Sequence, residues 1–238
     1  RRDIHENPEL LYDTHRTAAL VARKLREFGC DEVVEGIGRT GVVGLIRGRR
    51  DSRGHVVGLR ADMDALPIHE ATGLPHASKV PGKMHACGHD GHTAMLLGAA
   101  RYLAETRNFD GSVAVVFQPA EEGGAGGRAM VEDGLIPRFG IREIYGMHNS
   151  PGTPVGHFNI RPGPFYAATD NFTLTVTGRG GHAAKPHTAI DPVVIAAHTV
   201  LALQSIVARN ADPLKALVVS VTAVRTATEA WNVIPGTV

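Results

Sequence analysis

Apolar side chains recur at helical spacing near the start of the chain, between residues 9 and 28. This spacing is shared by Leu10, Leu11, Ala18, Leu20, Val21, Leu25 and Phe28. Apolar positions three and four residues apart lie on one face of a helix, and a glycine such as Gly29 commonly ends one. The pattern therefore predicts an amphipathic helix over residues 9–28.

Short apolar runs follow, at residues 42–46, 56–59 and 113–117, with a second helical pattern over residues 91–106. Continuous apolar runs of this length are typical of buried strands. Their alternation with helices favours an α/β domain built on a central, mostly buried sheet.

The composition of the chain changes around Gly163. Residues 172–176 alternate apolar and polar side chains, as in a strand with one face in water. Further strands are predicted at residues 216–224 and near residues 231–234. Between residues 176 and 216 a helix is expected to begin at Asp191-Pro192, because aspartate is a preferred N-cap and proline fits the first helical position.

The predicted domains are therefore residues 1–163 and an α+β layer over residues 164–238. The composition of the chain limits the kinds of partner that the two domains are expected to bind. The 238 residues include 25 basic and 24 acidic ones, for a formal charge of +1, with no block of like charges. A chain of this balance, with few aromatic residues, is not expected to bind nucleic acid.

The sequence also gives an expectation about the cellular location. No run of consecutive apolar residues reaches the roughly 18 to 20 that a membrane-spanning helix needs. The charged start at Arg1 is not followed by an apolar stretch that resembles a signal peptide. We therefore expect no membrane partner and a cytoplasmic location.

The densest group of chemically active side chains lies just before the helix predicted over residues 91–106. This segment contains His85, Cys87, His89, Asp90 and His92. Imidazole, thiolate and carboxylate groups suit a divalent transition metal, and a helix N-terminus also favours a thiolate. A polar loop with incidental histidines is the alternative.

A second group follows the strand predicted at residues 113–117, where Glu121 and Glu122 are adjacent. Open α/β proteins build their sites at the carboxyl ends of strands. One of two adjacent carboxylates can bind a metal while the other acts as a base. By itself, however, the pair would fit a solvated acidic turn equally well.

Three more candidates come after apolar segments, namely His148 and the pair Asp62 and Asp64. A lone histidine in such a place is more often structural than functional. A carboxylate at a strand end can orient a metal-binding histidine by accepting its second N–H. Taken together, these groups at strand ends favour one shared site.

Seven segments of the chain resemble the M20 family of metallopeptidases, specifically its amidohydrolase branch of hippurate hydrolases, N-acetyl-amino-acid deacetylases and auxin-conjugate hydrolases. They are RRDIHENPEL, LRADMDALPI, MHACGHDGHTAMLLGAA, VFQPAEEGG, GMHN, GRGGHAAKPH and NVIPG. The resemblance implies a zinc-exopeptidase-like catalytic domain, with a central mixed sheet flanked by helices, and an inserted α+β lid or dimerisation domain.

The resemblance also implies roles for individual residues. It implies two divalent ions, zinc or manganese with nickel or cobalt as alternatives. The ligands it implies are Cys87, which would bridge the ions, and His89, Glu122 and His148. Glu121 matches the general base and Asp64 matches an acid that orients the site. Asp62 stands where related peptidases carry a histidine ligand, and it is not counted as a ligand.

Two residues of the second domain match family motifs for substrate binding. His182 matches the lid histidine that stabilises the oxyanion of a substrate in the neighbouring subunit, and Asn232 matches a substrate-binding position. Apart from the resemblance, both residues fit glycine- or proline-rich turns. The implied assembly is a homodimer formed through the lid.

The expected function is hydrolysis of the amide bond of N-acyl amino acids. Family members are longer and carry a last metal-binding histidine beyond the segment matched here, so we expect residues 1–238 to be a fragment with an incomplete site and little activity. The alternatives are an M20-type dipeptidase or carboxypeptidase, a non-catalytic metal-binding or dimerisation module, and a thiol hydrolase that uses Cys87.

Overall fold

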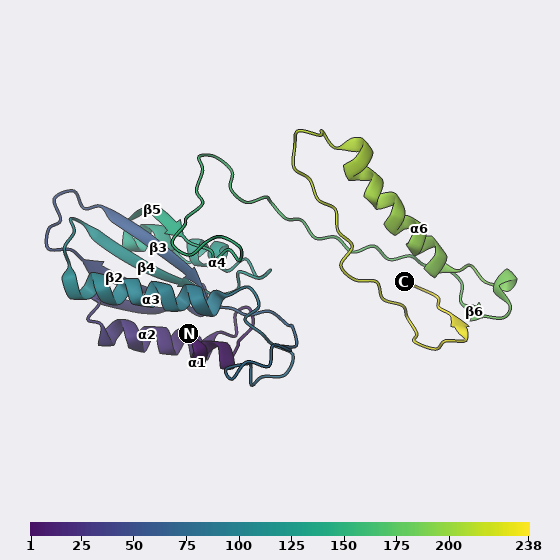
Figure 1. Ribbon diagram of the computed structural model, residues 1–238, viewed down its shortest axis with the longest axis horizontal. Helices are drawn as coiled ribbons and strands as arrows, with labels where there is room; N and C mark the ends of the chain where they lie inside the picture. The colour runs from purple at the N-terminus through teal and green to yellow at the C-terminus, as the bar shows by residue number, and fades with distance from the viewer. The chain divides into compact units, whose positions relative to one another are not determined.

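The computed structural model describes residues 1–238, which form two compact units, Arg1–Phe158 and Asn159–Val238 (Figure 1). This division falls shortly before Gly163, where the composition changes. That the first unit is a catalytic domain and the second a lid stays a prediction.

The first unit is built on a five-stranded mixed sheet with the strand order β1-β2-β4-β3-β5. The strands are β1 (Glu32–Ile37), β2 (Gly41–Arg47), β3 (Val56–Asp62), β4 (Ser112–Gln118) and β5 (Ile141–Gly146). β1 and β2 run antiparallel to their neighbours, whereas β4, β3 and β5 are parallel. The carboxyl ends of these three parallel strands therefore lie along one edge of the sheet.

Helices cover both faces of this sheet (Figure 1). They are α1 (Arg2–Glu6), α2 (His15–Glu27), α3 (His89–Thr106), α4 (Gly126–Glu132) and α5 (Leu135–Phe139). One core joins α2 and α3 to the sheet around Leu25 and Phe117, and the other joins α4 and α5 to it around Met130. The predicted α/β architecture with a central mixed sheet is confirmed.

The strands predicted at residues 42–46, 56–59 and 113–117 and the helix predicted over 91–106 are all present. The helix predicted over residues 9–28 begins only at His15. Leu11 adopts a positive φ of 48°, which interrupts a helix. The carboxylate of Glu9 then accepts the backbone N–H groups of Arg16 and Thr17, at 2.9 and 2.8 Å, and so caps α2 from outside.

The second unit contains the helix α6 (Pro192–Ser205), which begins as predicted. The carboxylate of Asp191 accepts the N–H of Val193 at 2.8 Å, and Pro192 occupies the first turn. A short 3₁₀ turn, η1 (Pro186–Thr188), precedes it, and a π-helical turn, η2 (Ile206–Asn210), follows it. The one ladder is the pair β6 (Gly181–His182) and β7 (Val233–Ile234), which is antiparallel.

The strands predicted at residues 172–176 and 216–224 are wrong, because neither segment forms a strand. Val176 does exchange two backbone hydrogen bonds with Val238, but the pairing does not extend to Phe172, which is 61 % exposed. Alternation of apolar and polar residues favours a strand only where a neighbouring strand and a packing layer are available.

The continuous helical segment formed by α6 and η2 is long and apolar enough to cross a membrane, judged by length and composition only. The sequence expectation rested on a count of consecutive apolar residues, and this helix does not decide it, so the absence of a membrane partner stays a prediction. A single helix of this kind is weak evidence, because core helices pass the same test.

Glu70 organises the irregular segment between β3 and α3. Its carboxylate accepts the Thr72 hydroxyl and the Ser78 backbone N–H, the latter at 2.7 Å, and contacts the His5 ring. The hydrogen bonds from Thr72 and Ser78, opposed by burial, lower the pKa of Glu70 to about 2. Glu70 therefore stabilises the fold above the pKa of an unfolded glutamate, and this contribution is lost as pH falls towards 2.

We expect Glu70→Gln to lower the free energy of unfolding by about 1–2 kcal/mol at pH 7, because hydrogen bonds to a charged acceptor are lost. Denaturant unfolding measured from pH 7 to pH 2 should show this deficit shrinking as wild-type Glu70 becomes protonated. Glu32→Gln, at an exposed edge-strand position, is the control. A deficit that stays constant with pH would contradict the role given to the carboxylate.

Candidate metal centre

The candidate residues meet at the edge of the sheet where β3, β4 and β5 end. Asp64 follows β3, Glu121 and Glu122 follow β4, and His148 follows β5. The N-terminus of α3 brings His89 to the same place. Four segments that are distant in sequence thus place polar side chains together, three of them because parallel neighbours share one carboxyl edge.

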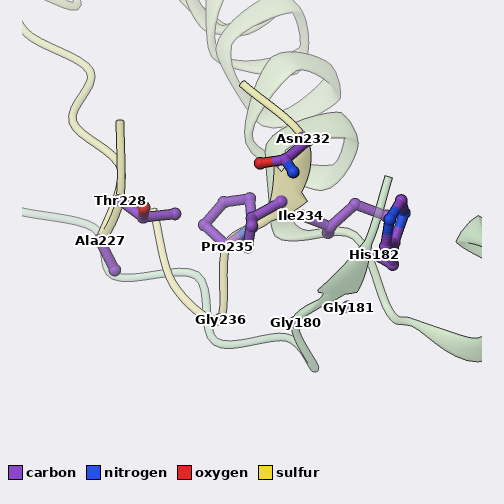
Figure 2. A pocket seen from close by; sticks show the side chains of 10 residues that line it. Gly180, Gly181, His182, Ala227, Thr228, Asn232, Ile234, Pro235 and Gly236 are labelled. Carbon is purple, nitrogen blue, oxygen red and sulfur yellow. The ribbon is translucent and has the colours of Figure 1, made fainter. Parts of the chain in front are cut away.

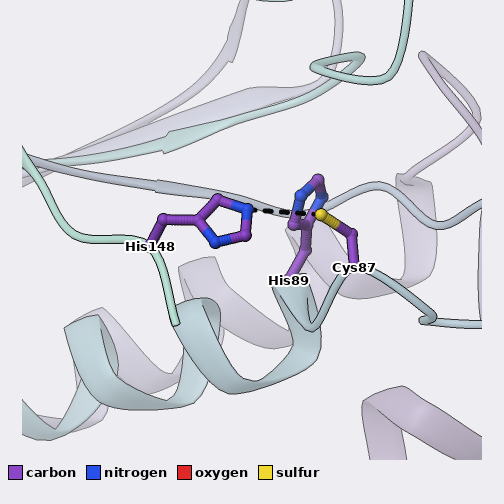
Figure 3. A group of neighbouring side chains, drawn as sticks. All are labelled: Cys87, His89 and His148. Atoms are coloured by element: carbon purple, nitrogen blue, oxygen red, sulfur yellow. Dashed lines mark hydrogen bonds between the residues drawn. The ribbon is translucent and has the colours of Figure 1, made fainter. Parts of the chain in front are cut away.

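Three candidate ligand side chains, one thiol and two imidazoles, face one another at this edge (Figure 3). The thiol of Cys87 lies 3.2 Å from Nε2 of His148. These two groups and a ring nitrogen of His89 all lie within 4.8 Å of one another. Such a spacing allows one ion to contact all three side chains, since metal–nitrogen and metal–sulfur bonds of zinc are about 2.0–2.3 Å long.

The two adjacent glutamates complete a second group around the same histidine. Nε2 of His89 lies 3.9 Å from a carboxylate oxygen of Glu121 and 3.8 Å from one of Glu122. Glu122 is the more buried of the two, with a side chain 20 % exposed against 43 % for Glu121. A buried ligand beside a more accessible carboxylate fits the division into ligand and base.

Backbone carbonyls set the tautomer of both candidate histidine ligands. Nδ1 of His89 donates to the carbonyl oxygen of Asp64 at 2.8 Å, and Nδ1 of His148 donates to that of Asn149 at 2.7 Å. In each ring Nε2 is then the unprotonated nitrogen, and that of His148 faces the thiol of Cys87. This arrangement is usual for metal-binding histidines, which donate their other N–H to a carbonyl or carboxylate.

Asp64 connects three of these segments. Its fully buried carboxylate accepts the backbone N–H groups of Glu121 and Glu122, at 3.0 and 3.1 Å. Ala120, the residue before Glu121, adopts a positive φ of 51°, which turns the chain towards Asp64. Asp64 therefore sets the position of both glutamates and, through its carbonyl, of His89.

The residues of the HACGHDGH segment do not all face this site. Asp90 accepts hydrogen bonds from His5 and Arg1, at 3.0 and 2.9 Å, on the far side of the helix start. The buried ring of His85 lies 6.2 Å from that of His5, and burial lowers its pKa to about 4. Cys87 and His89 are thus the members of the segment that reach the candidate ligand set.

Asp62, which was not counted as a ligand, lies 3.6 Å from Nε2 of His89, but both of its carboxylate oxygens are hydrogen-bonded. It accepts hydrogen bonds from Arg60 at 2.8 Å and from His92 at 2.6 Å. Burial disfavours its charge, but these two partners outweigh burial and lower its pKa to about 2. His92 was not among the predicted site residues. Its position three residues after His89, on the same helix face, is the signal that could have found it.

The donor set fits a divalent cation. Nε2 of His89 and one carboxylate oxygen of Glu122 are buried with no hydrogen-bond partner in the protein. Buried polar atoms without a partner are costly, and a cation would satisfy both. Burial and the charge of Glu122 raise the pKa of the Cys87 thiol to about 12. Without a compensating cation this thiol is a poor nucleophile, which disfavours a thiol hydrolase.

The remaining predicted residues lie in the second unit, where β6 and β7 border a pocket (Figure 2). His182 and Asn232 both line it. Nδ1 of His182 accepts the backbone N–H of Ala184 at 3.1 Å, so Nε2 carries the proton and can donate to a ligand. The structure thus brings these two residues together with each other.

A family model described as Peptidase family M20/M25/M40 matches residues 58–235. The match covers the candidate metal centre and both residues of the β6–β7 pocket. The chain belongs to this family.

Its relatives include enzymes that cleave amide bonds. A hippurate hydrolase from Campylobacter jejuni is 51 % identical over 99 % of this chain and 60 % of its own length. An N-acetylcysteine deacetylase from Bacillus subtilis is 46 % identical over 99 % and 61 %. Thermostable carboxypeptidase 2 from Saccharolobus solfataricus is 46 % identical over 99 % and 59 %. The chain therefore spans about 60 % of the length of these relatives.

A solved structure shows the same relationship. A dinuclear metal-binding peptidase of the M20 family from Bacillus subtilis matches with a TM-score of 0.68 and 40 % identity. The match covers 99 % of this chain and 59 % of that one. The fold class expected from the sequence is therefore confirmed at the level of the family.

Gly88 provides a test of how tightly this site is built. It adopts a φ of +97°, and a Cβ atom there would lie 2.8 Å from the side-chain oxygen of Asn149. Gly82 has a φ of +75° but open space around it, so it isolates the backbone effect. We expect both Gly→Ala variants to lose about 1 kcal/mol of unfolding free energy.

Only Gly88→Ala should also displace Asn149 and weaken divalent-metal binding, by about 10-fold. Denaturant unfolding and calorimetric titration with Mn²⁺ measure the two effects. Equal metal affinity in the two variants would show that the close approach of residues 88 and 149 does not matter for the site.

Proposed function

We propose that the protein containing this chain hydrolyses the amide bond of N-acyl amino acids. In this proposal Cys87, His89, Glu122 and His148 hold a pair of divalent cations. The observation that carries it is the convergence of these side chains, with the lone pairs of both imidazoles turned towards the thiol and the carboxylates. Zinc and manganese both suit this donor set, with nickel and cobalt as alternatives.

The cations would supply Lewis-acid chemistry and lower the pKa of water from about 16 towards 7. Glu121 is proposed to accept the proton of the attacking water and to return it to the departing amine nitrogen. Its greater exposure and its 3.9 Å separation from Nε2 of His89 support this role. Asp64 is proposed to hold Glu121 in place through its backbone N–H.

His182 is proposed to stabilise the oxyanion that forms on the acyl carbonyl, from the lid of a neighbouring subunit. The proton on its Nε2 supports this role, because an oxyanion is stabilised by a positioned N–H donor. Asn232 is proposed to bind the substrate beside it. The homodimer and the cytoplasmic location remain predictions.

A second candidate is a carboxypeptidase of the same family. The similarity to thermostable carboxypeptidase 2 favours it, since the identity is equal to that of the N-acetylcysteine deacetylase. Hydrolysis of N-acyl amino acids and carboxypeptidase activity would share one mechanism. They differ in the group that the cleaved amide bond joins to the amino acid. A panel of hippurate, N-acetylcysteine and unblocked dipeptides separates them by the ratios of kcat/KM.

The roles of the two glutamates can be separated in the whole protein. We expect Glu121→Gln to reduce kcat by at least about 100-fold with unchanged metal stoichiometry, because the general base is removed. Glu122→Gln should lose metal affinity as well as activity, because a ligand is weakened. Metal content is measured by elemental analysis and activity with hippurate.

Glu132→Gln, on the exposed side of α4, is the matched control and should change neither property. Removal of metal by a chelator should abolish activity, and added Mn²⁺ or Zn²⁺ should restore it. Near-normal turnover in Glu121→Gln would rule out its role as base. A protein that binds metal but cleaves none of the substrates would favour the non-catalytic module.

A further inference from the structure

A buried chain of hydrogen bonds runs beside the candidate ligands without belonging to them. Arg60 donates to the side chain of Gln118 at 2.9 Å and to Asp62 at 2.8 Å. The second carboxylate oxygen of Asp62 accepts the Nδ1 proton of His92 at 2.6 Å. The side chains of Asp62 and His92 are only 1 % and 2 % exposed, so neither is shared with solvent.

This series of hydrogen bonds ends at Asn149, the residue that follows the candidate ligand His148. Nε2 of His92 accepts the backbone N–H of Asn149 at 3.0 Å, and the side-chain oxygen of Asn149 lies against the same nitrogen. The carbonyl of Asn149 in turn accepts the Nδ1 proton of His148 at 2.7 Å. Both polar backbone groups of Asn149 are therefore used, one to hold the residue and one to orient His148.

The ring of His92 also packs against the rings of both candidate histidine ligands. Its ring centroid lies 4.6 Å from that of His148, at an interplanar angle of 68°, and 5.3 Å from that of His89. His92 thus packs against both imidazoles, whose own centroids lie 6.1 Å apart. Edge-to-face contact of this kind limits the rotation of the rings about their side-chain bonds.

We propose that His92, held by Asp62, is a positioning residue that fixes Asn149 and thereby directs Nε2 of His148 towards Cys87. It is not a ligand, although it lies close enough to His89 and Asp62 to form a possible ligand group. Both of its nitrogens are engaged, and the guanidinium of Arg60 beside Asp62 would repel another cation. The functional part of this inference rests on the proposed role of His148 as a ligand.

Two variants interrupt this series of hydrogen bonds in different ways. His92→Phe keeps a ring of similar size and removes both hydrogen bonds. In Asp62→Asn, Arg60 holds the remaining oxygen, so the new NH₂ group faces Nδ1 of His92. The ring proton must then move to Nε2, which would no longer accept the backbone N–H of Asn149 and would donate instead to its side-chain oxygen. His55→Phe, an exposed histidine of the same unit, is the matched control.

Calorimetric titration of residues 1–238 with Mn²⁺ should show about 10- to 100-fold weaker binding in both variants and none of this loss in the control, because supporting partners of ligands act at this magnitude. Hydrogen exchange of the metal-free proteins should quicken at residues 147–150 and stay unchanged in β4. Nitrogen NMR should show the His92 proton on Nε2 in Asp62→Asn.

Wild-type metal affinity and wild-type exchange at residues 147–150 in Asp62→Asn would overturn the proposal, even if His92→Phe failed to fold. Failure of the proposed function looks different. In that case the whole protein would cleave no amide, while exchange at residues 147–150 and the NMR signal of His92 would still respond to Asp62→Asn.

Discussion

The candidate centre depends on the hydrogen bonds that converge on Asp64. Its two carboxylate oxygens accept the backbone N–H groups of Glu121 and Glu122, and its carbonyl accepts the Nδ1 proton of His89. These partners come from the loop after β4 and from the start of α3, whereas Asp64 itself follows β3. A single buried residue thus sets the distances between groups that the chain supplies from three separate places. Charge-assisted hydrogen bonds of this kind are strong inside a protein, where water does not compete.

His148 is oriented in the same way as His89, by a backbone carbonyl, but through other residues. There the backbone of Asn149 takes the place of Asp64, and His92 holds it. Each candidate histidine therefore has one nitrogen bound to a backbone carbonyl and the other turned inward. The unsatisfied Nε2 of His89 and the unsatisfied oxygen of Glu122 are the consequence of this arrangement. Polar atoms are left without partners in the place where a cation would satisfy them, as expected for a site built in advance of its ligand.

Much of the first unit could be predicted from the sequence, because apolar runs and helical spacing report burial directly. Strand ends could be predicted as well, and with them the approximate places of Asp64, Glu121 and His148. The pattern did not predict β1, whose glutamates are exposed at the sheet edge, or the late start of α2 behind the Glu9 cap. It also could not show that His85 and Asp90 turn away from Cys87, because the direction of a side chain in a turn depends on backbone angles.

In the second unit the Asp191 cap was predictable from two residues. The strands predicted at residues 172–176 and 216–224 were wrong, because strands need partners from elsewhere in the chain.

Cys87, His89, Glu122 and His148 are proposed to bind a divalent cation together. X-ray absorption of the protein loaded with one equivalent of Zn²⁺ measures which atoms surround the ion. We expect a sulfur neighbour at about 2.3 Å and nitrogen or oxygen neighbours at about 2.0–2.2 Å, with the sulfur contribution lost in Cys87→Ser. A zinc environment of nitrogen and oxygen alone in the wild-type protein, unchanged by Cys87→Ser, would contradict it.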